Sequence, residues 1–274
     1  MRSTGAILAL LAVPAAMACP RRPGTSITTA AVASTATPDA VSSSVSFSAS
    51  PLPNYSSSSA SSAVSASTAL PVVASSNAVK GTSTFYGGNL NGGTCSFTTY
   101  SLPSGIYGTA FSGSAWNSAA HCGACLDVTA NGKTITVMIV DKCPECDEGH
   151  LDLFEDAFNV FASSSTGLLP TSYTFVDCPI SSPLVLHNKS GTSAYWFSMQ
   201  VVNANEPVSK LEVSTDGGST WKSTKRQDYN FFENPSGFGT DTVTVRVTSE
   251  SGSTVTVRNV SVASDSQVTA GSNF

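Results

Sequence analysis

Apolar and polar residues alternate strictly in the last third of the chain. The alternation has a period of two, which is typical of β-strands with one buried and one exposed face. It is carried by Val243, Val245 and Val247, and it returns at Val255 and Val257. Leu211 and Val213 lead into Asp216-Gly-Gly218, a sequence that favours a hairpin turn. These patterns predict a β-sandwich for this part of the chain.

Two other patterns precede the alternating region. Residues 134–141 are almost continuously apolar, as expected of a strand that is covered on both faces. Phe154, Ala157, Phe158 and Phe161 recur at helical spacing, which predicts a short amphipathic helix over residues 153–162. We therefore expect short strands with one helical segment here.

The first residues have the pattern of a signal peptide. Arg2 precedes the apolar run of residues 6–13, and Ala16-Met-Ala18 supplies the small residues that signal peptidase accepts. The run is too short to span a bilayer, and no later segment reaches 18 apolar residues. We expect residues 1–18 to be removed and the protein to be secreted, with no membrane partner.

Composition divides the remaining chain. Residues 19–79 are dominated by Ser, Ala and Thr, and such a segment cannot bury enough apolar surface to fold. It is predicted to be a disordered linker. Folded sequence then divides at Cys178-Pro179 and Pro183, giving one domain over 80–179 and another over 183–266.

Charge excludes one class of partner. The net charge is −5 and only 11% of residues are charged, without the basic stripe of a nucleic-acid-binding protein. The three histidines are scattered, and no HExxH motif, Ser/His/Asp arrangement or phosphate-binding glycine loop is present, so no cofactor is expected. We expect a monomer. Asn54, Asn188 and Asn259 begin Asn-x-Ser motifs for glycosylation.

Six cysteines lie in the first folded domain: Cys95, Cys122, Cys125, Cys143, Cys146 and Cys178. The pairs Cys122-Gly-Ala-Cys125 and Cys143-Pro-Glu-Cys146 have the spacing of a zinc ribbon. Export instead favours disulfides, because secreted proteins fold in an oxidising compartment. We expect disulfides and no metal, although six cysteines allow about 15 pairings and the spacing does not choose among them. Cys19 is left over.

Several motifs occur together in one order. They are Gly81-Thr-Ser-Thr-Phe-Tyr-Gly-Gly88, His121-Cys-Gly-Ala-Cys125, and Val140-Asp-Lys-Cys-Pro-Glu-Cys146 followed by Gly149-His-Leu-Asp-Leu153. Downstream lie residues 194–202 and Asp228-Tyr-Asn-Phe-Phe232. The whole resembles the expansin family, and the cysteine-rich variant resembles fungal expansin-like proteins of the loosenin type. The resemblance implies an all-β fold: a six-stranded double-psi β-barrel followed by an immunoglobulin-like β-sandwich that binds carbohydrate.

The resemblance also implies a site. A polar barrel groove would contain Asp152, Asp141 and Thr84, with Tyr86 where bacterial members have a second threonine. The sandwich would continue it with an aromatic platform of Tyr195, Trp196 and Tyr229, and with Lys189 nearby. The implied function is non-hydrolytic loosening of cell-wall polysaccharide such as cellulose, another β-glucan or chitin. The implied disulfides are Cys95–Cys122, Cys125–Cys178 and Cys143–Cys146.

Simpler roles remain open for these residues. Asp152, with Glu155 three residues later, could cap a helix, and Asp141 could bond backbone amides at a strand end. Trp196 falls in a predicted strand, where neighbouring side chains face opposite ways, so either Tyr195 or Trp196 would belong to the core. Trp221 is expected to pack against the protein, and Trp116 is expected to be buried in the barrel.

Two other functions compete with wall loosening. Small inverting cellulases share the barrel and need a second carboxylate as base. The segment that supplies that base in those enzymes corresponds here to residues 84–89, which contain no carboxylate. Hydrolysis is therefore not expected. A weak glycosidase or lytic transglycosylase and a passive polysaccharide-binding or host-interaction protein are the alternatives.

Overall fold

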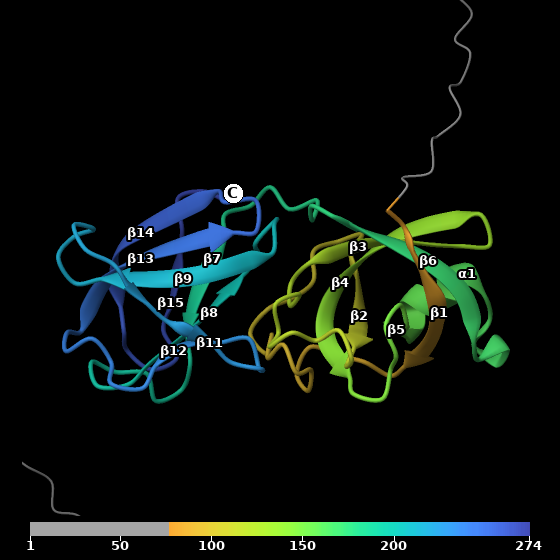
Figure 1. Ribbon diagram of the computed structural model, residues 1–274, viewed down its shortest axis with the longest axis horizontal. Coiled ribbons are helices and arrows are strands. Elements are labelled where there is room, and N and C mark those ends of the chain that lie inside the picture. The colour runs from red at the N-terminus through yellow and green to blue at the C-terminus, as the bar shows by residue number, and fades with distance from the viewer. Residues whose placement is uncertain (1–76) are drawn as a thin grey trace, which may run out of the picture. The chain divides into compact units, whose positions relative to one another are not determined.

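The computed structural model describes residues 77–274 (Figure 1). Its first part is a closed six-stranded barrel in the order β1-β5-β2-β4-β3-β6. The strands are β1 (Val79–Tyr86), β2 (Tyr107–Ser112), β3 (Cys125–Ala130), β4 (Lys133–Cys143), β5 (Leu151–Phe154) and β6 (Leu169–Val176). Between β5 and β6 lie α1 (Glu155–Phe161) and a 3₁₀ turn, η1 (Ser164–Thr166).

Strand β4 is the buried strand that the apolar run at 134–141 predicted. Its residues Val137 to Val140 are almost fully buried, because β4 pairs on one side with β2 and on the other with β3. Barrel closure leaves no exposed edge on which a strand could pair with another chain.

The helix is shorter than its pattern predicted. Leu153 and Phe154 belong to β5, where they pair in parallel with Phe85 and Tyr86 of β1. The helix begins only at Glu155 and buries Ala157, Phe158 and Phe161. The prediction of a helix from residue 153 was wrong because the β1–β5 ladder takes the backbone groups that the helix would have used.

The second part consists of two antiparallel sheets, with strand orders β10-β9-β13-β14 and β11-β12-β8-β7-β15. The strands are β7 (Val185–Asn188), β8 (Phe197–Val202), β9 (Val208–Ser214), β10 (Lys222–Ser223), β11 (Lys225–Arg226), β12 (Phe232–Asn234), β13 (Thr242–Ser249), β14 (Thr254–Ser261) and β15 (Gln267–Thr269). The alternating valines of β13 and β14 are buried in the core. Over the described residues, the predicted all-β fold of barrel and sandwich is confirmed.

Three disulfides lie in and around the barrel. They join Cys95 to Cys122, Cys125 to Cys178 and Cys143 to Cys146, the same pairs that the resemblance implied. No group of three or more His, Cys, Asp or Glu side chains that could hold a metal ion occurs within residues 77–274.

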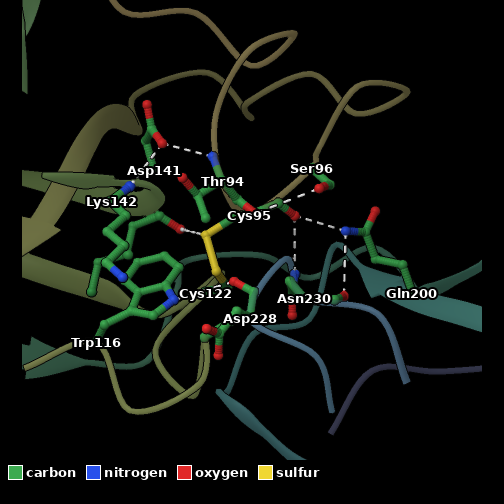
Figure 2. The surroundings of a disulfide bond; sticks show 12 residues. Thr94, Cys95, Ser96, Trp116, Cys122, Asp141, Lys142, Gln200, Asp228 and Asn230 are labelled. Carbon is green, nitrogen blue, oxygen red and sulfur yellow. Dashed lines mark hydrogen bonds between the residues drawn. A yellow bond between two sulfur atoms is a disulfide. The ribbon is translucent and has the colours of Figure 1, made fainter. Parts of the chain in front are cut away.

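Polar contacts join the barrel to the sandwich around the first disulfide (Figure 2). The carbonyl oxygen of Cys95 accepts hydrogen bonds from Gln200 Nε2 at 2.8 Å and Asn230 Nδ2 at 3.3 Å. The indole N–H of Trp116 donates to the carbonyl of Asp228 at 3.2 Å. Trp116 is buried as expected, and its indole N–H forms a hydrogen bond with a residue of the sandwich.

The predicted signal peptide at 1–18 and nearly all of the linker at 19–79 lie outside the described residues, as do Cys19 and Asn54. Across residues 77–274, no helix has the length and apolar character needed to cross a membrane.

Candidate functional site

Four polar side chains converge where β1 and β5 run side by side. Thr82 and Thr84 lie two residues apart on β1, and Asp152 lies on β5, two residues after His150, which directly precedes that strand. Side chains two residues apart on a strand point to the same face. The parallel register places Thr84 opposite Asp152 and Ser83 opposite Leu151. Consequently Ser83 and Leu151 are buried, while the four polar side chains share the other face.

These side chains form one hydrogen-bonded network. Thr84 Oγ1 donates to Asp152 Oδ1 at 2.6 Å, and the same oxygen lies 2.9 Å from His150 Nε2. The other ring nitrogen, His150 Nδ1, lies 3.0 Å from Thr82 Oγ1. One imidazole thus bridges both threonines, and the carboxylate is tied to one of them.

The network lies in a groove of about 430 Å³. Its other lining residues are Gly81 of β1, Cys143 at the end of β4, and Glu145, Cys146, Asp147 and Glu148 of the loop between β4 and β5. The Cys143–Cys146 disulfide closes this loop. The groove is therefore polar and rich in carboxylates, with a covalently closed loop along one wall.

Asp152 does not cap the helix. The residue before α1 is Phe154, whose side chain makes no capping bond, and the Asp152 carboxylate bonds Thr84 instead. At the first turn Asp156 Oδ1 accepts from the N–H of Ala157. The capping alternative for Asp152 is thus wrong, because this residue belongs to β5 and not to the helix.

Asp141 lies near the end of β4 and does not line the groove. Its Oδ1 accepts the backbone N–H groups of Thr94 at 2.6 Å and Lys142 at 2.8 Å. Its Oδ2 accepts the hydroxyl of Tyr86 at 3.2 Å. The geometry favours the simpler role for Asp141, which is to hold the loop that contains Cys95.

Tyr86 packs against protein on several sides. Its ring meets Phe154 edge-on and contacts the cluster of Ala110, Cys143 and Cys146. Burial, and then the Asp141 carboxylate, raise the pKa of the Tyr86 phenol far above its usual value. The hydroxyl therefore stays protonated and donates to Asp141.

In the sandwich, Tyr195 and Trp196 precede β8 and do not lie within it. Tyr195 is in a turn and is 81% exposed, and Trp196 makes an isolated bridge with Ser193 before β8 begins at Phe197. Trp196 is half-buried. The expectation that one of the two belongs to the core was wrong, because strand alternation starts only after them.

Tyr229 and Lys189 lie next to each other. The Tyr229 hydroxyl donates to Glu233 Oε1 at 2.7 Å, and Lys189 Nζ lies 5.7 Å from the ring centres of both Tyr229 and Phe231. Burial and the Glu233 carboxylate raise the pKa of Tyr229 to about 12. Trp221 is half-buried beneath the guanidinium of Arg246 and packs as expected.

Asn188 is not placed to carry a glycan. Its side chain is buried, and Nδ2 donates to the carbonyl of Ser261 at 2.7 Å and to Ser266 Oγ at 2.8 Å. The nitrogen that a glycan would modify is thus occupied inside the fold. Asn259, by contrast, is exposed.

Comparison with known proteins decides the family. A family model described as lytic transglycolase matches residues 108–173. Expansin-like protein 5 of Dictyostelium discoideum is 29% identical over 209 residues, covering 73% of this chain and 87% of the relative. Expansin-YoaJ of Bacillus subtilis (strain 168) is 33% identical over 181 residues, covering 64% of this chain and 75% of the relative. The chain belongs to the expansin family.

A solved expansin has the same fold. The crystal structure of a mutant Clavibacter michiganensis expansin in complex with cellohexaose is 30% identical to this expansin, with a TM-score of 0.65. The match covers 72% of this chain and 97% of that one.

Sequence reasoning missed two residues of the groove network, Thr82 and His150, and left His150 among scattered histidines. The signal was present, because His150 and Asp152 flank the apolar Leu151 and a strand brings such residues to one face. Thr82 carried the same signal relative to Thr84. Both were overlooked because no metal or catalytic motif includes them.

Proposed function

We propose that this expansin loosens cell-wall polysaccharide without hydrolysing it. The barrel groove contacts one polysaccharide chain through Asp152 and Thr84. The sandwich binds the same polysaccharide chain through Tyr195, Trp196, Tyr229 and Lys189. Cellohexaose bound to the Clavibacter michiganensis expansin supports a β-glucan such as cellulose as the ligand. The carboxylate of Asp152 competes for glucan hydroxyls that otherwise bond neighbouring chains, since charged acceptors form the stronger hydrogen bonds.

The observation that carries this proposal is the bond from Thr84 to Asp152. Asp152 accepts the Thr84 hydroxyl at 2.6 Å through Oδ1, and no residue of the described chain donates to Oδ2. A carboxyl group that is held in place on one side and open to the groove on the other suits an acceptor of sugar hydroxyl groups.

The test compares mechanical and chemical effects on one substrate. Filter paper or isolated wall strips under load should extend faster with the protein, while reducing ends on amorphous cellulose stay at the level of a buffer blank. Binding without faster extension would instead indicate a passive polysaccharide-binding protein.

A weak lytic activity is the second candidate. It is favoured by the description of the matching family model and by three further carboxylates on the groove wall, Glu145, Asp147 and Glu148, any of which could act as a base. Release of reducing ends that disappears in the Glu145→Gln, Asp147→Asn, Glu148→Gln triple variant would place the protein among the glycoside hydrolases.

We also propose that the protein acts outside the cell. Three disulfides support an oxidising compartment, and residues 1–18 have the pattern of a signal peptide. We assign 80–179 to the barrel domain and 183–266 to the carbohydrate-binding domain, behind a linker at 19–79. The six cysteines support a relation to the fungal, loosenin-type members.

A further inference from the structure

The hydrogen atoms of the groove network can be assigned by counting donors. Thr84 has a single hydroxyl hydrogen, and Thr84 Oγ1 donates it to Asp152 Oδ1. The Thr84 oxygen can then only accept from the ring nitrogen 2.9 Å away. His150 Nε2 must therefore carry a hydrogen.

The same counting fixes the other half of the network. A neutral imidazole has a hydrogen on one nitrogen alone, so Nδ1 of His150 is an acceptor when Nε2 is protonated. The Thr82 hydroxyl, 3.0 Å from Nδ1, therefore donates to it. The donors run in one direction, from Thr82 to His150, to Thr84, and to Asp152.

We propose that His150 is a positioning residue that leaves the side chains of this groove as hydrogen-bond acceptors only. Both threonine hydrogens are used inside the network, so Thr82 and Thr84 offer only oxygen lone pairs to a ligand. Asp152 Oδ2 accepts no hydrogen bond from any residue of the described chain, which leaves it free for a sugar hydroxyl. Glu145, Asp147 and Glu148 add acceptors along the wall.

A preference for one ligand chemistry follows, and it rests on the proposed function. A polysaccharide in this groove has to supply the hydrogens, through hydroxyl or amino groups. Ligand groups that can only accept, such as ethers, fluorine or carboxylates, meet oxygen lone pairs and are disfavoured. The groove therefore selects unsubstituted, hydroxyl-rich chains and disfavours etherified or acidic ones.

The tautomer is measured directly, on the full chain at a pH where imidazoles are neutral. Long-range ¹H–¹⁵N NMR distinguishes a protonated Nε2 from a protonated Nδ1 in each histidine. We expect the Nε2–H form for His150, and a weaker preference for it in Thr84→Val, because the acceptor for that hydrogen is gone. A predominantly Nδ1–H ring would overturn the proposal. This result needs no polysaccharide and stands apart from the proposed function.

Ligand binding supplies the second measurement. Cellohexaose is titrated while backbone amides of the groove and of the platform are followed separately, which distinguishes the two sites. His150→Phe should weaken the groove affinity about three- to tenfold, the scale of one or two hydrogen bonds. His150→Gln should restore most of it, because its amide offers one donor and one acceptor to the threonines. Equal affinity of His150→Phe and wild type would contradict the positioning role.

Fluorinated ligands test the acceptor-only character. Cellohexaose with a hydroxyl of a groove-bound ring replaced by fluorine keeps an acceptor and loses a donor. Its groove affinity should fall by a similar factor, and an unchanged affinity at every replaced position would refute the assignment. If cellohexaose moves neither set of amides, the proposed function fails while the tautomer result remains.

Discussion

At the scale of single residues, the two aspartates singled out in the sequence have different surroundings. Asp141 accepts two backbone N–H groups and one phenol. Asp152 accepts one threonine hydroxyl and faces the groove. A carboxylate whose oxygens are already occupied holds structure, whereas one with a free oxygen can bind a ligand.

Replacing Asp152 by Asn should abolish most wall loosening with little change in stability. The amide can still accept from Thr84, but it is neutral, and neutral acceptors make hydrogen bonds about half as strong as charged ones. Wall extension under load and thermal unfolding are measured on the same variant. The matched control is Asp156→Asn, which lies at the start of α1 outside the groove and should loosen walls like the wild type. Full activity of Asp152→Asn would contradict the groove role.

At the scale of elements, periodicity located β4, β13 and β14 because their buried side chains form the continuous run or the alternation that the sequence shows. It misplaced the start of α1, because Leu153 fits the apolar pattern of a strand as well as that of a helix. Only its pairing with β1 makes Leu153 part of a strand. It also placed Trp196 in a strand, although β8 begins one residue later. Pairing between strands that are distant in the sequence cannot be seen in a local pattern. The residues at which the elements end could therefore not be predicted from the sequence.

The site shows the same limit. Thr84 and Asp152 are far apart in sequence and meet only because β1 and β5 are neighbours in the closed barrel. The resemblance supplied that pair, but the role of His150 depends on which face of β5 it shares, and the role of Asp141 on a loop with no regular structure. The types of residue in the site could be predicted from the sequence, but the residues that each side chain contacts could not.

The turn before β8 yields a prediction about binding. Replacing Tyr195 or Trp196 by Ala should weaken binding to insoluble cellulose several-fold, if a ring that stacks on a sugar contributes on the order of 1 kcal/mol, as a pair of aromatic rings does. Tyr195 is largely exposed, so its removal should not alter the unfolding temperature. Pulldown on cellulose measures the loss, with Trp221→Ala as the matched aromatic control. Unchanged retention of both turn variants would remove these residues from the platform.

At the scale of the whole molecule, two histidines couple stability to pH. Burial lowers the pKa of His121, and the cation of Arg226 adds to the effect, while Glu250 opposes it. Burial also lowers the pKa of His187, against opposing contributions from Gln200 and Asp265. The folded state therefore binds fewer protons than the unfolded state over the range between the two pKa values.

The contribution of these two histidines to the free energy of unfolding should therefore be fully present above a pH of about 6.5, the imidazole pKa in the unfolded chain. It should fall as the pH drops below that value. The unfolding temperature is measured between about pH 8 and pH 5, where imidazoles titrate. His121→Gln and His187→Gln should each flatten the decline. If the unfolding temperature of the double variant declines with the same slope as that of the wild type, carboxylates alone cause the decline.

The carbonyl of Cys95 has a consequence for cooperativity. This barrel residue is fixed by a disulfide on one side and held by two amides of the sandwich on the other. Two cores joined through such a rigid point should melt in one calorimetric transition, with equal calorimetric and van't Hoff enthalpies. The Cys95→Ser, Cys122→Ser variant should separate it into two transitions, because the loop that carries the carbonyl then moves independently. Two transitions already in the wild type would mean that barrel and sandwich unfold as separate units.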